Sequence, residues 1–252
     1  AQGVSVLLGP GLNIKRSPLC GRNFEYFSED PYLAGKMAAA YVRGIQKNGV
    51  AACPKHFAVN SQELRRMASD SIVDERTLRE IYLTGFEMVV KEAHPKTIMS
   101  AYNLINGTYA NENAHLLQDI LRRDWGFEGA VVTDWGGSND HALGVKNGST
   151  LEMPCPGDDS IRELIKAVQT GKITQADVDA RLDELLELVF TTKAAVDAAP
   201  GKFDADAHHA LARRAAAQSI VLLKNENSLL PLAKGEKVAV IGDFAQTPRY
   251  QG

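Results

Sequence analysis

A carboxylate stands directly after a short β-branched run, where it could take part in chemistry. Asp134 follows Val131–Thr133 and precedes Trp135 and two glycines. A carboxylate next to an aromatic ring at the end of a strand is typical of a sugar-binding site. An aspartate before glycines is equally typical of a helix cap. The presence or absence of other reactive side chains near Asp134 distinguishes these two interpretations.

Other polar side chains follow neighbouring predicted strands in the same way. Lys55 and His56 lie just beyond one strand, Tyr102 and Asn103 lie beyond the next, and Arg22 follows the first. A single lysine or arginine is usually a solvated surface residue. Several polar groups at successive strand ends are harder to explain by solvation, because the carboxyl ends of parallel strands meet at one edge of a sheet. We therefore expect these side chains to converge on one polar pocket.

The elements that would position these residues alternate between strands and helices. The predicted strands are Val4–Leu8, Val50–Cys53, Thr97–Ala101, Ala130–Thr133 and Thr150–Met153, and a second group is Ile220–Lys224 and Val238–Ile241. Helices are predicted over 31–47, 74–93, 113–125, 158–198 and 206–218. The first helix has Asp30 as an N-cap and Pro31 at its first position. Strands that alternate with helices indicate parallel pairing.

The number of strands predicts an α/β fold of the (β/α)8 TIM-like barrel type. Only five strands precede residue 158, and a closed barrel takes about 250 residues, so we expect the barrel to be incomplete at its N-terminus. The predicted organisation is a barrel domain over 1–198, a linker and helix over 199–218, and the start of an α/β sandwich domain over 219–252. The run Val240–Asp243 lacks the full glycine pattern of a dinucleotide site.

Composition excludes several classes of partner. Of 252 residues, 28 are Lys or Arg and 31 are Asp or Glu, which gives a net charge of -3. This charge provides no cationic excess for nucleic acid or an anionic membrane. No run approaches the roughly 18 apolar residues of a membrane span. Three scattered cysteines form no metal-binding pair, so we predict no metal and no cofactor. The compartment is not predicted, and a homo-oligomer is left open.

The ordered motifs resemble one known family. Its early barrel is similar to Gly9–Ile14 and Gly21–Glu25, followed by Glu29-Asp30-Pro31. The later motifs are Lys55-His56-Phe57, Asn60–Glu63, Arg66, Asp74-Glu75-Arg76, Leu78-Arg79-Glu80, Met99–Asn103 and Val131–Trp135. In this order they resemble the β-glucosidase type of family 3 glycoside hydrolases, from about Gly3 to Leu232.

The resemblance implies a retaining, exo-acting β-glycosidase that acts on a β-glucoside or an oligosaccharide. Asp134 would be the nucleophile that attacks the anomeric carbon. The sugar would be bound by Arg22, Lys55, His56 and Arg66, with Tyr102 beside the nucleophile and Met99 and Trp135 lining the pocket. An oxocarbenium-like transition state gains from a nearby anion and from hydroxyl hydrogen bonds that tighten as the ring flattens, so the chemistry agrees with the family.

A retaining enzyme also needs a general acid, and the sequence offers no second carboxyl group with a good claim. In this branch of the family the acid is a glutamate of the second domain, which is expected beyond Gly252. Glu152 is the best rival within the chain. One departure from the family is Thr150, where an aspartate is more usual, so hydrogen bonding under the pocket is expected to differ.

Three alternatives stay open at this stage. Within the family, a β-xyloside or an α-arabinoside is the second choice of substrate. In a different class, Lys55 could form a Schiff base in a class I aldolase. The third alternative is a carbohydrate-binding barrel without catalysis.

Overall fold

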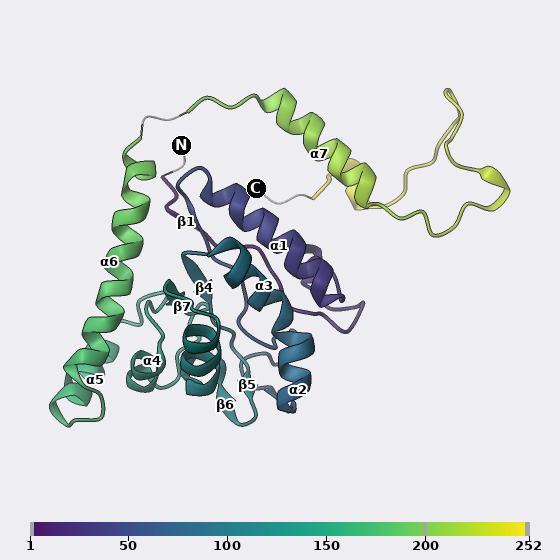
Figure 1. Ribbon diagram of the computed structural model, residues 1–252. Coiled ribbons are helices and arrows are strands. Elements are labelled where there is room, and N and C mark those ends of the chain that lie inside the picture. The colour runs from purple at the N-terminus through teal and green to yellow at the C-terminus, as the bar shows by residue number, and fades with distance from the viewer. Residues whose placement is uncertain (1–2, 199–200, 250–252) are drawn as a thin grey trace. The chain divides into compact units, whose positions relative to one another are not determined.

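The computed structural model describes residues 3–198 and 201–249, and the chain divides into two units, Ala1–Pro200 and Gly201–Gly252 (Figure 1). The strands are β1 (Val6–Leu7), β2 (Ala51–Ala52), β3 (Asp70–Ser71), β4 (Thr97–Met99), β5 (Leu104–Ile105), β6 (Thr108–Tyr109) and β7 (Ala130–Val132). The helices of the first unit are η1 (Asn23–Glu25), α1 (Pro31–Gln46), α2 (Glu75–Thr77), η2 (Leu78–Tyr82), α3 (Thr84–Ala93), η3 (Ala110–Glu112), η4 (His115–Asp124), α4 (His141–Asn147), α5 (Asp158–Gln169) and α6 (Gln175–Asp197). Those of the second are α7 (Ala205–Ser219), η5 (Glu226–Ser228) and α8 (Asp243–Gln246).

The first unit contains a run of parallel strands in sequence order. β1 pairs with β2, and β4 pairs with β7. A parallel bridge between Phe57 and Ser100 joins the extension of β2 to that of β4, and another joins Val132 to Leu151. The prediction of parallel pairing is confirmed. All these segments therefore direct their carboxyl ends to the same side.

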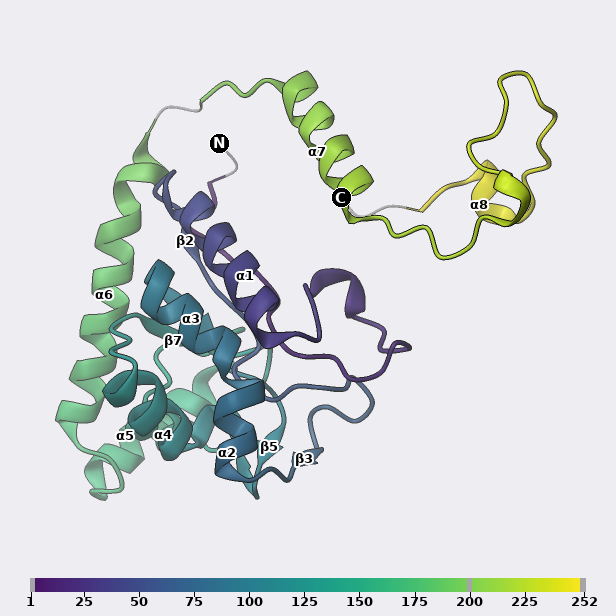
Figure 2. The same cartoon turned by 45° about the vertical axis from the view of Figure 1, so that its right-hand side comes forward.

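The helices α1 and α3 pack against each other along this sheet, as the two ribbon views agree (Figure 2). The Asp30 side chain accepts hydrogen bonds from the backbone N–H groups of Tyr32 and Leu33, and Pro31 stands at the first position. The predicted start of α1 is thus confirmed. A Cβ on Gly35 would lie 3.1 Å from the Gly85 Cα and 2.8 Å from the Met88 Sδ. Only glycine at this position permits so close an approach of the two helices.

The predicted barrel is not closed within residues 3–198 and 201–249. The parallel strands form an arc from β1 to Leu151, which is too few strand positions for a barrel of eight. A separate small sheet has the order β3–β5–β6. The described part of the chain is therefore a mixed α/β structure. It contains no helix that is both long and apolar enough to cross a membrane.

Some elements predicted from the sequence differ from those in the structure. The helix predicted over 158–198 is two helices, because Gly171 turns the chain with φ +74° and Thr174 and Asp177 form a capping box that starts α6. The strands predicted at 220–224 and 238–241 are irregular and exposed in the second unit. Strand-like sequence forms a strand only with a hydrogen-bonded partner, and neither run has one among the described residues. Residues 199–200 of the predicted linker lie outside the described residues.

The side chain of Asn13 clamps the backbone at His56. Its Nδ2 donates to the His56 carbonyl at 2.7 Å, and its Oδ1 accepts from the His56 N–H at 2.8 Å. Asn13 is 3% exposed and His56 is 1% exposed. The clamp therefore satisfies two backbone groups that water does not reach.

We predict that Asn13→Ala lowers the free energy of unfolding by about 2–4 kcal/mol, because it leaves two buried polar groups unpaired. Urea unfolding followed by circular dichroism measures this loss. The exposed Asn48 provides the control, and Asn48→Ala should change the free energy of unfolding by at most about 0.5 kcal/mol. Equal losses in the two variants would contradict a clamp at Asn13.

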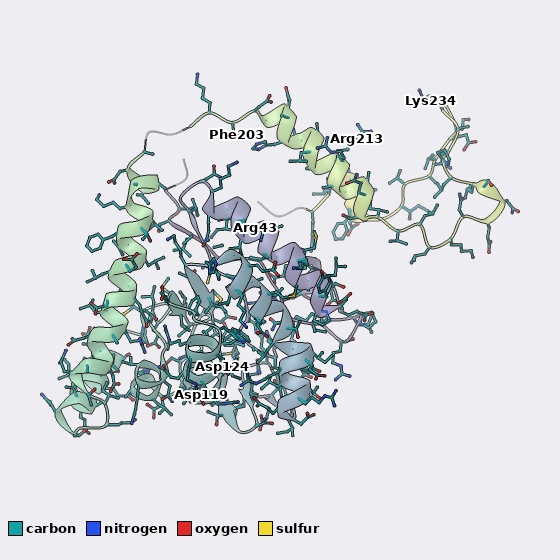
Figure 3. All side chains as sticks on the ribbon, viewed as in Figure 1. Arg43, Asp119, Asp124, Phe203, Arg213 and Lys234 are labelled. Atoms are coloured by element: carbon teal, nitrogen blue, oxygen red, sulfur yellow. The ribbon has the colours of Figure 1, made fainter. Side chains whose placement is uncertain are left out.

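Six charged residues form a closed ring between η4 and the α2–η2 segment. His115 contacts Glu75 at 3.0 Å and Asp119 at 3.1 Å. Asp119 pairs with Arg123, which contacts Asp124, and Arg79 joins Asp124 back to Glu75. Asp119 and Asp124 lie along η4 in Figure 3. Partial burial lowers the pKa of His115, but Asp119 and Glu75 outweigh it, and the net shift is upward from 6.5.

A group with a raised folded-state pKa stabilises the protein fully below its unfolded pKa and loses that effect as the pH rises through the folded value. We therefore predict that His115→Gln lowers the melting temperature at pH 6, by about 1–3 °C, and has a smaller effect at pH 9. Scanning calorimetry at both pH values tests this. His209→Gln, at an exposed position of α7, is the control. A His115 effect of equal size at both pH values would rule out the ring as its cause.

Candidate active site

Asp134 lies two residues beyond β7 and is 8% exposed. Its Oδ1 accepts a hydrogen bond from the Trp135 N–H at 2.8 Å. Its Oδ2 is 3.4 Å from the His56 Nε2 and accepts no hydrogen bond among the described residues. One carboxylate oxygen is therefore held in place while the other keeps its lone pairs available. Asp134 does not cap α4, because the cap of that helix is Asp140.

His56 lies between Asp134 and two residues of the segment around η1. The Tyr26 hydroxyl is 2.8 Å from the His56 Nδ1, and the Arg22 Nη2 is 3.3 Å from Nε2. Burial lowers the pKa of His56 well below 6.5, and the nearby cations Arg22 and Lys55 lower it further. His56 is therefore neutral, so it can donate one hydrogen bond and accept another.

Tyr102, Arg66 and Trp135 extend this group of contacting side chains. The Tyr102 hydroxyl donates to the Trp135 carbonyl at 2.7 Å, and the Arg66 guanidinium lies 4.6 Å from the centre of the Tyr102 ring. Burial and the charge of Asp134 raise the pKa of Tyr102 to about 12, so its hydroxyl stays protonated. Trp135 is 43% exposed and presents a ring face.

The cations of the pocket are paired with two carboxylates. Glu25 accepts a hydrogen bond from Arg22 and lies 3.2 Å from the Lys55 Nζ. Glu63 binds Arg66 at 2.8 Å and Lys15 at 2.9 Å, and Arg22 lies 3.9 Å from it. A groove of about 500 Å³ beside Lys55 is lined by both Glu25 and Tyr26.

Seven of the eight predicted site residues thus lie in one connected group, and Met99 lies beneath it. Met99 is 2% exposed and packs with Cys53 and Val132. Burial raises the pKa of Cys53 to about 12, so this thiol is not a nucleophile. The Met99 side chain therefore contributes apolar packing under the strand ends.

Three residues that contact the predicted site were not assigned to it from the sequence. They are Glu25, Tyr26 and Lys15, and all lie between β1 and α1. Glu25 was named only as part of the motif Gly21–Glu25, with no role of its own. Its spacing of three from Arg22 within a short helical turn was the available signal, because such pairs meet. The contact of Tyr26 with His56 has no comparable local signal.

Two further carboxyl groups lie near the strand ends but are engaged elsewhere. Glu152 contacts His141 at 2.8 Å and accepts a hydrogen bond from Ser160. Glu112 is 4% exposed, and its Oε1 accepts hydrogen bonds from the backbone N–H groups of Asn139 and Asp140. Burial raises the pKa of Glu112. Its function in this arrangement is to fix the loop that follows Asp134.

Thr150 makes two side-chain hydrogen bonds beside β7. Its hydroxyl accepts from the Val131 N–H at 3.0 Å and donates to Glu184 at 2.5 Å. Glu184 also binds Arg122 at 2.9 Å and Arg181 at 2.6 Å. The carboxylate that binds Thr150 therefore comes from α6.

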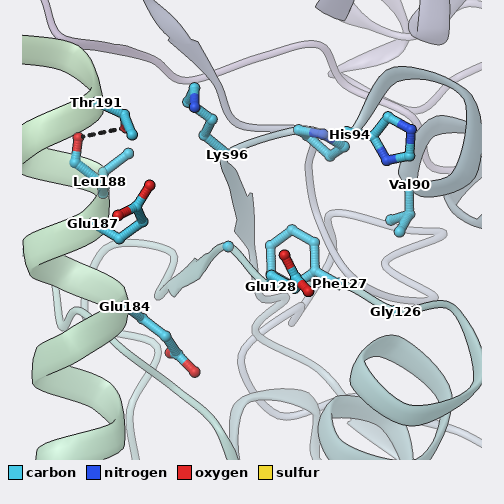
Figure 4. Close-up of a pocket in the computed structure, with 12 residues that line it drawn as sticks. Val90, His94, Lys96, Gly126, Phe127, Glu128, Glu184, Glu187, Leu188 and Thr191 are labelled. Atoms are coloured by element: carbon cyan, nitrogen blue, oxygen red, sulfur yellow. Dashed lines mark hydrogen bonds between the residues drawn. The ribbon is translucent and has the colours of Figure 1, made fainter.

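A different pocket, of about 200 Å³, lies at the opposite ends of β4 and β7 (Figure 4). Lys96, Glu128 and Glu187 line it, and none of the predicted site residues does. The described residues contain no group of three or more histidine, cysteine or acidic side chains arranged for a metal ion.

Comparison with known proteins identifies the family of the chain. Residues 1–188 match the family described as the glycosyl hydrolase family 3 N terminal domain. The chain is 51% identical to thermostable beta-glucosidase B of Acetivibrio thermocellus, covering 100% of this chain and 33% of that protein. It is 48% identical to the exo-alpha-(1->6)-L-arabinopyranosidase of Bifidobacterium breve, covering 99% of this chain and 34% of that protein. The chain thus spans about a third of the length of these relatives.

Solved structures give the same result. The Bifidobacterium adolescentis GH3 beta-glucosidase is 47% identical with a TM-score of 0.90, covering 99% of this chain and 37% of that one. Beta-glucosidase 3B of Thermotoga neapolitana in complex with glucose is 44% identical with a TM-score of 0.84, covering 91% of this chain and 33% of that one. By sequence and by fold, the chain belongs to glycoside hydrolase family 3.

Proposed function

We propose that the protein is a retaining, exo-acting β-glycosidase, with a terminal β-D-glucosyl residue as its substrate and Asp134 as its nucleophile. The observation that carries this proposal is the different hydrogen bonding of the two carboxylate oxygens of Asp134. The Trp135 N–H orients Oδ1, while Oδ2 accepts no hydrogen bond among the described residues. A carboxylate held in this way is ready to attack an anomeric carbon.

The surrounding groups suit a sugar in the first subsite. Lys55, Arg22 and Arg66 donate hydrogen bonds to hydroxyl oxygens, and neutral His56 can donate or accept one. The exposed face of Trp135 packs against the C–H side of the ring. Hydrogen bonds that tighten as the sugar flattens lower the barrier to an oxocarbenium-like transition state. No cofactor takes part in these steps.

In the first step Asp134 Oδ2 forms a bond to the anomeric carbon while the glycosidic bond breaks and the leaving oxygen takes a proton from an acid. In the second, water attacks the glycosyl ester and gives its proton to the same group. We propose that this acid/base lies outside these 252 residues. Glu25 and Glu63 each bind two cations, Glu152 binds His141, and Glu112 is buried.

We further propose that the parallel arc is part of the (β/α)8 barrel of the family, with residues 219–252 beginning a second α/β domain. The runner-up substrate is an α-arabinoside, because the chain is 48% identical to an arabinopyranosidase. A panel of nitrophenyl glycosides distinguishes it from a β-glucoside. Membership of a glycosidase family removes support for an aldolase at Lys55.

We predict that 2,4-dinitrophenyl 2-deoxy-2-fluoro-β-glucoside inactivates the protein by labelling Asp134. The fluorine slows hydrolysis of the glycosyl ester, and the leaving group needs no acid. Mass spectrometry of the intact protein and of its peptides locates the label. Asp134→Asn should take up no label, and Asp158→Asn, at an exposed position of α5, should be labelled normally. A label on another residue would exclude Asp134 as the nucleophile.

We also predict that these 252 residues alone hydrolyse cellobiose at a negligible rate, because acid assistance contributes about 10²–10⁴ in rate. The same preparation should release dinitrophenol from the activated β-glucoside, which shows that the nucleophile site is folded. Product analysis by chromatography and absorbance measures both reactions. Efficient cellobiose hydrolysis would place the acid within the chain, and Glu152→Gln would then be the first variant to test.

A further inference from the structure

Glu25 connects two of the predicted sugar-binding cations. Its Oε1 accepts a hydrogen bond from the Arg22 Nε, and its Oε2 lies 3.2 Å from the Lys55 Nζ. Lys55 comes from the end of β2 and Arg22 from the turn before η1. One carboxylate therefore joins two segments that are far apart in the chain.

These three charged side chains are partly buried, so their contacts with one another matter more than contacts at an exposed surface would. The side chains of Glu25, Arg22 and Lys55 are 20%, 23% and 16% exposed. Burial alone would raise the pKa of Glu25, but Arg22 and Lys55 outweigh burial and lower the pKa. Glu25 is therefore charged at neutral pH and at mildly acidic pH. Without this charge, two partly buried cations would repel each other in the same pocket.

We propose that Glu25 is a positioning residue of the glycosidase site, which holds the Arg22 guanidinium and the Lys55 ammonium in the orientation that binds sugar hydroxyls. This inference rests on the function proposed above. Glu25 acts through the two cations and does not touch the reacting atoms. Lys55 has three donors and Arg22 has five, so both can bind Glu25 and still offer N–H groups to a substrate.

The same arrangement bears on the class of substrate. Glu25 and Glu63 together pair Lys15, Arg22, Lys55 and Arg66. The two carboxylates offset two of these four positive charges, which weakens the attraction of the site for a uronic acid relative to a neutral sugar. Loss of the Glu25 charge shifts this preference toward an anionic ligand.

The test compares Glu25→Gln, Glu25→Ala and the control Glu29→Gln in the full-length protein. Glu29 lies four residues away and is exposed. Glutamine has the shape of glutamate, but its NH2 group must face one of the two cations. With 2,4-dinitrophenyl β-glucoside, kcat/KM should fall about 10- to 100-fold in both Glu25 variants and stay unchanged in the control. Circular dichroism verifies that each variant is folded.

A double-mutant cycle separates positioning from a general structural effect. If Glu25 acts through Lys55, then Glu25→Ala should cost much less in a Lys55→Ala background than in the wild type. A second readout is inhibition by glucuronate relative to glucose. The ratio of the two inhibition constants should move toward glucuronate by about tenfold in Glu25→Gln, because the variant has one negative charge fewer near the sugar.

Three results would overturn the proposal. The first is a kcat/KM within twofold of the wild type in both Glu25 variants. The second is full additivity in the cycle, together with an unchanged preference between glucuronate and glucose. In either case the wild type remains an active glycosidase and only the role of Glu25 fails. The third is a wild type that neither hydrolyses nor binds any glycoside, in which case the proposed function and the role of Glu25 fail together.

Discussion

Parallel pairing of the strands is the constraint on which the site depends. Because β2, β4 and β7 run in the same direction, the residues that follow them emerge at one edge of the sheet. Lys55, Tyr102 and Asp134 are far apart in sequence and meet only for this reason. The apolar cluster of Cys53, Met99 and Val132 lies directly under them and fixes the strand ends.

Charge compensation is the second condition, since partly buried cations are costly without partners. The pocket solves this by alternating signs along one chain of contacts from Lys55 through Glu25 and Arg22 to Glu63 and Arg66. Each carboxylate accepts from more than one cation. The hydrogen-bond donors are thereby held in place, and donors held in this way need little reorganisation to bind a further acceptor.

Local chemistry determined which features could be predicted from the sequence. The start of α1 was predictable because Asp30 and Pro31 act on their own neighbours, and the position of Asp134 because it lies two residues beyond a strand. The break before α6 was missed because Gly171 and Thr174 lie within an otherwise helical pattern. The contact of Glu25 with Lys55 depends on how two distant turns approach each other, and no periodicity in the sequence encodes that. The strands predicted in the second unit failed because their formation needs a partner.

Thr150 illustrates how the strand that leads to Asp134 is supported by a neighbouring helix. A hydroxyl can accept and donate at once, so Thr150 accepts a hydrogen bond from the Val131 N–H and donates one to Glu184. An aspartate at this position would bring a second carboxylate next to Glu184, and the two charges would repel. With threonine, Glu184 alone balances Arg122 and Arg181, both of them largely buried. Thr150 is therefore matched to its neighbour on α6, and it anchors the strand that leads to Asp134.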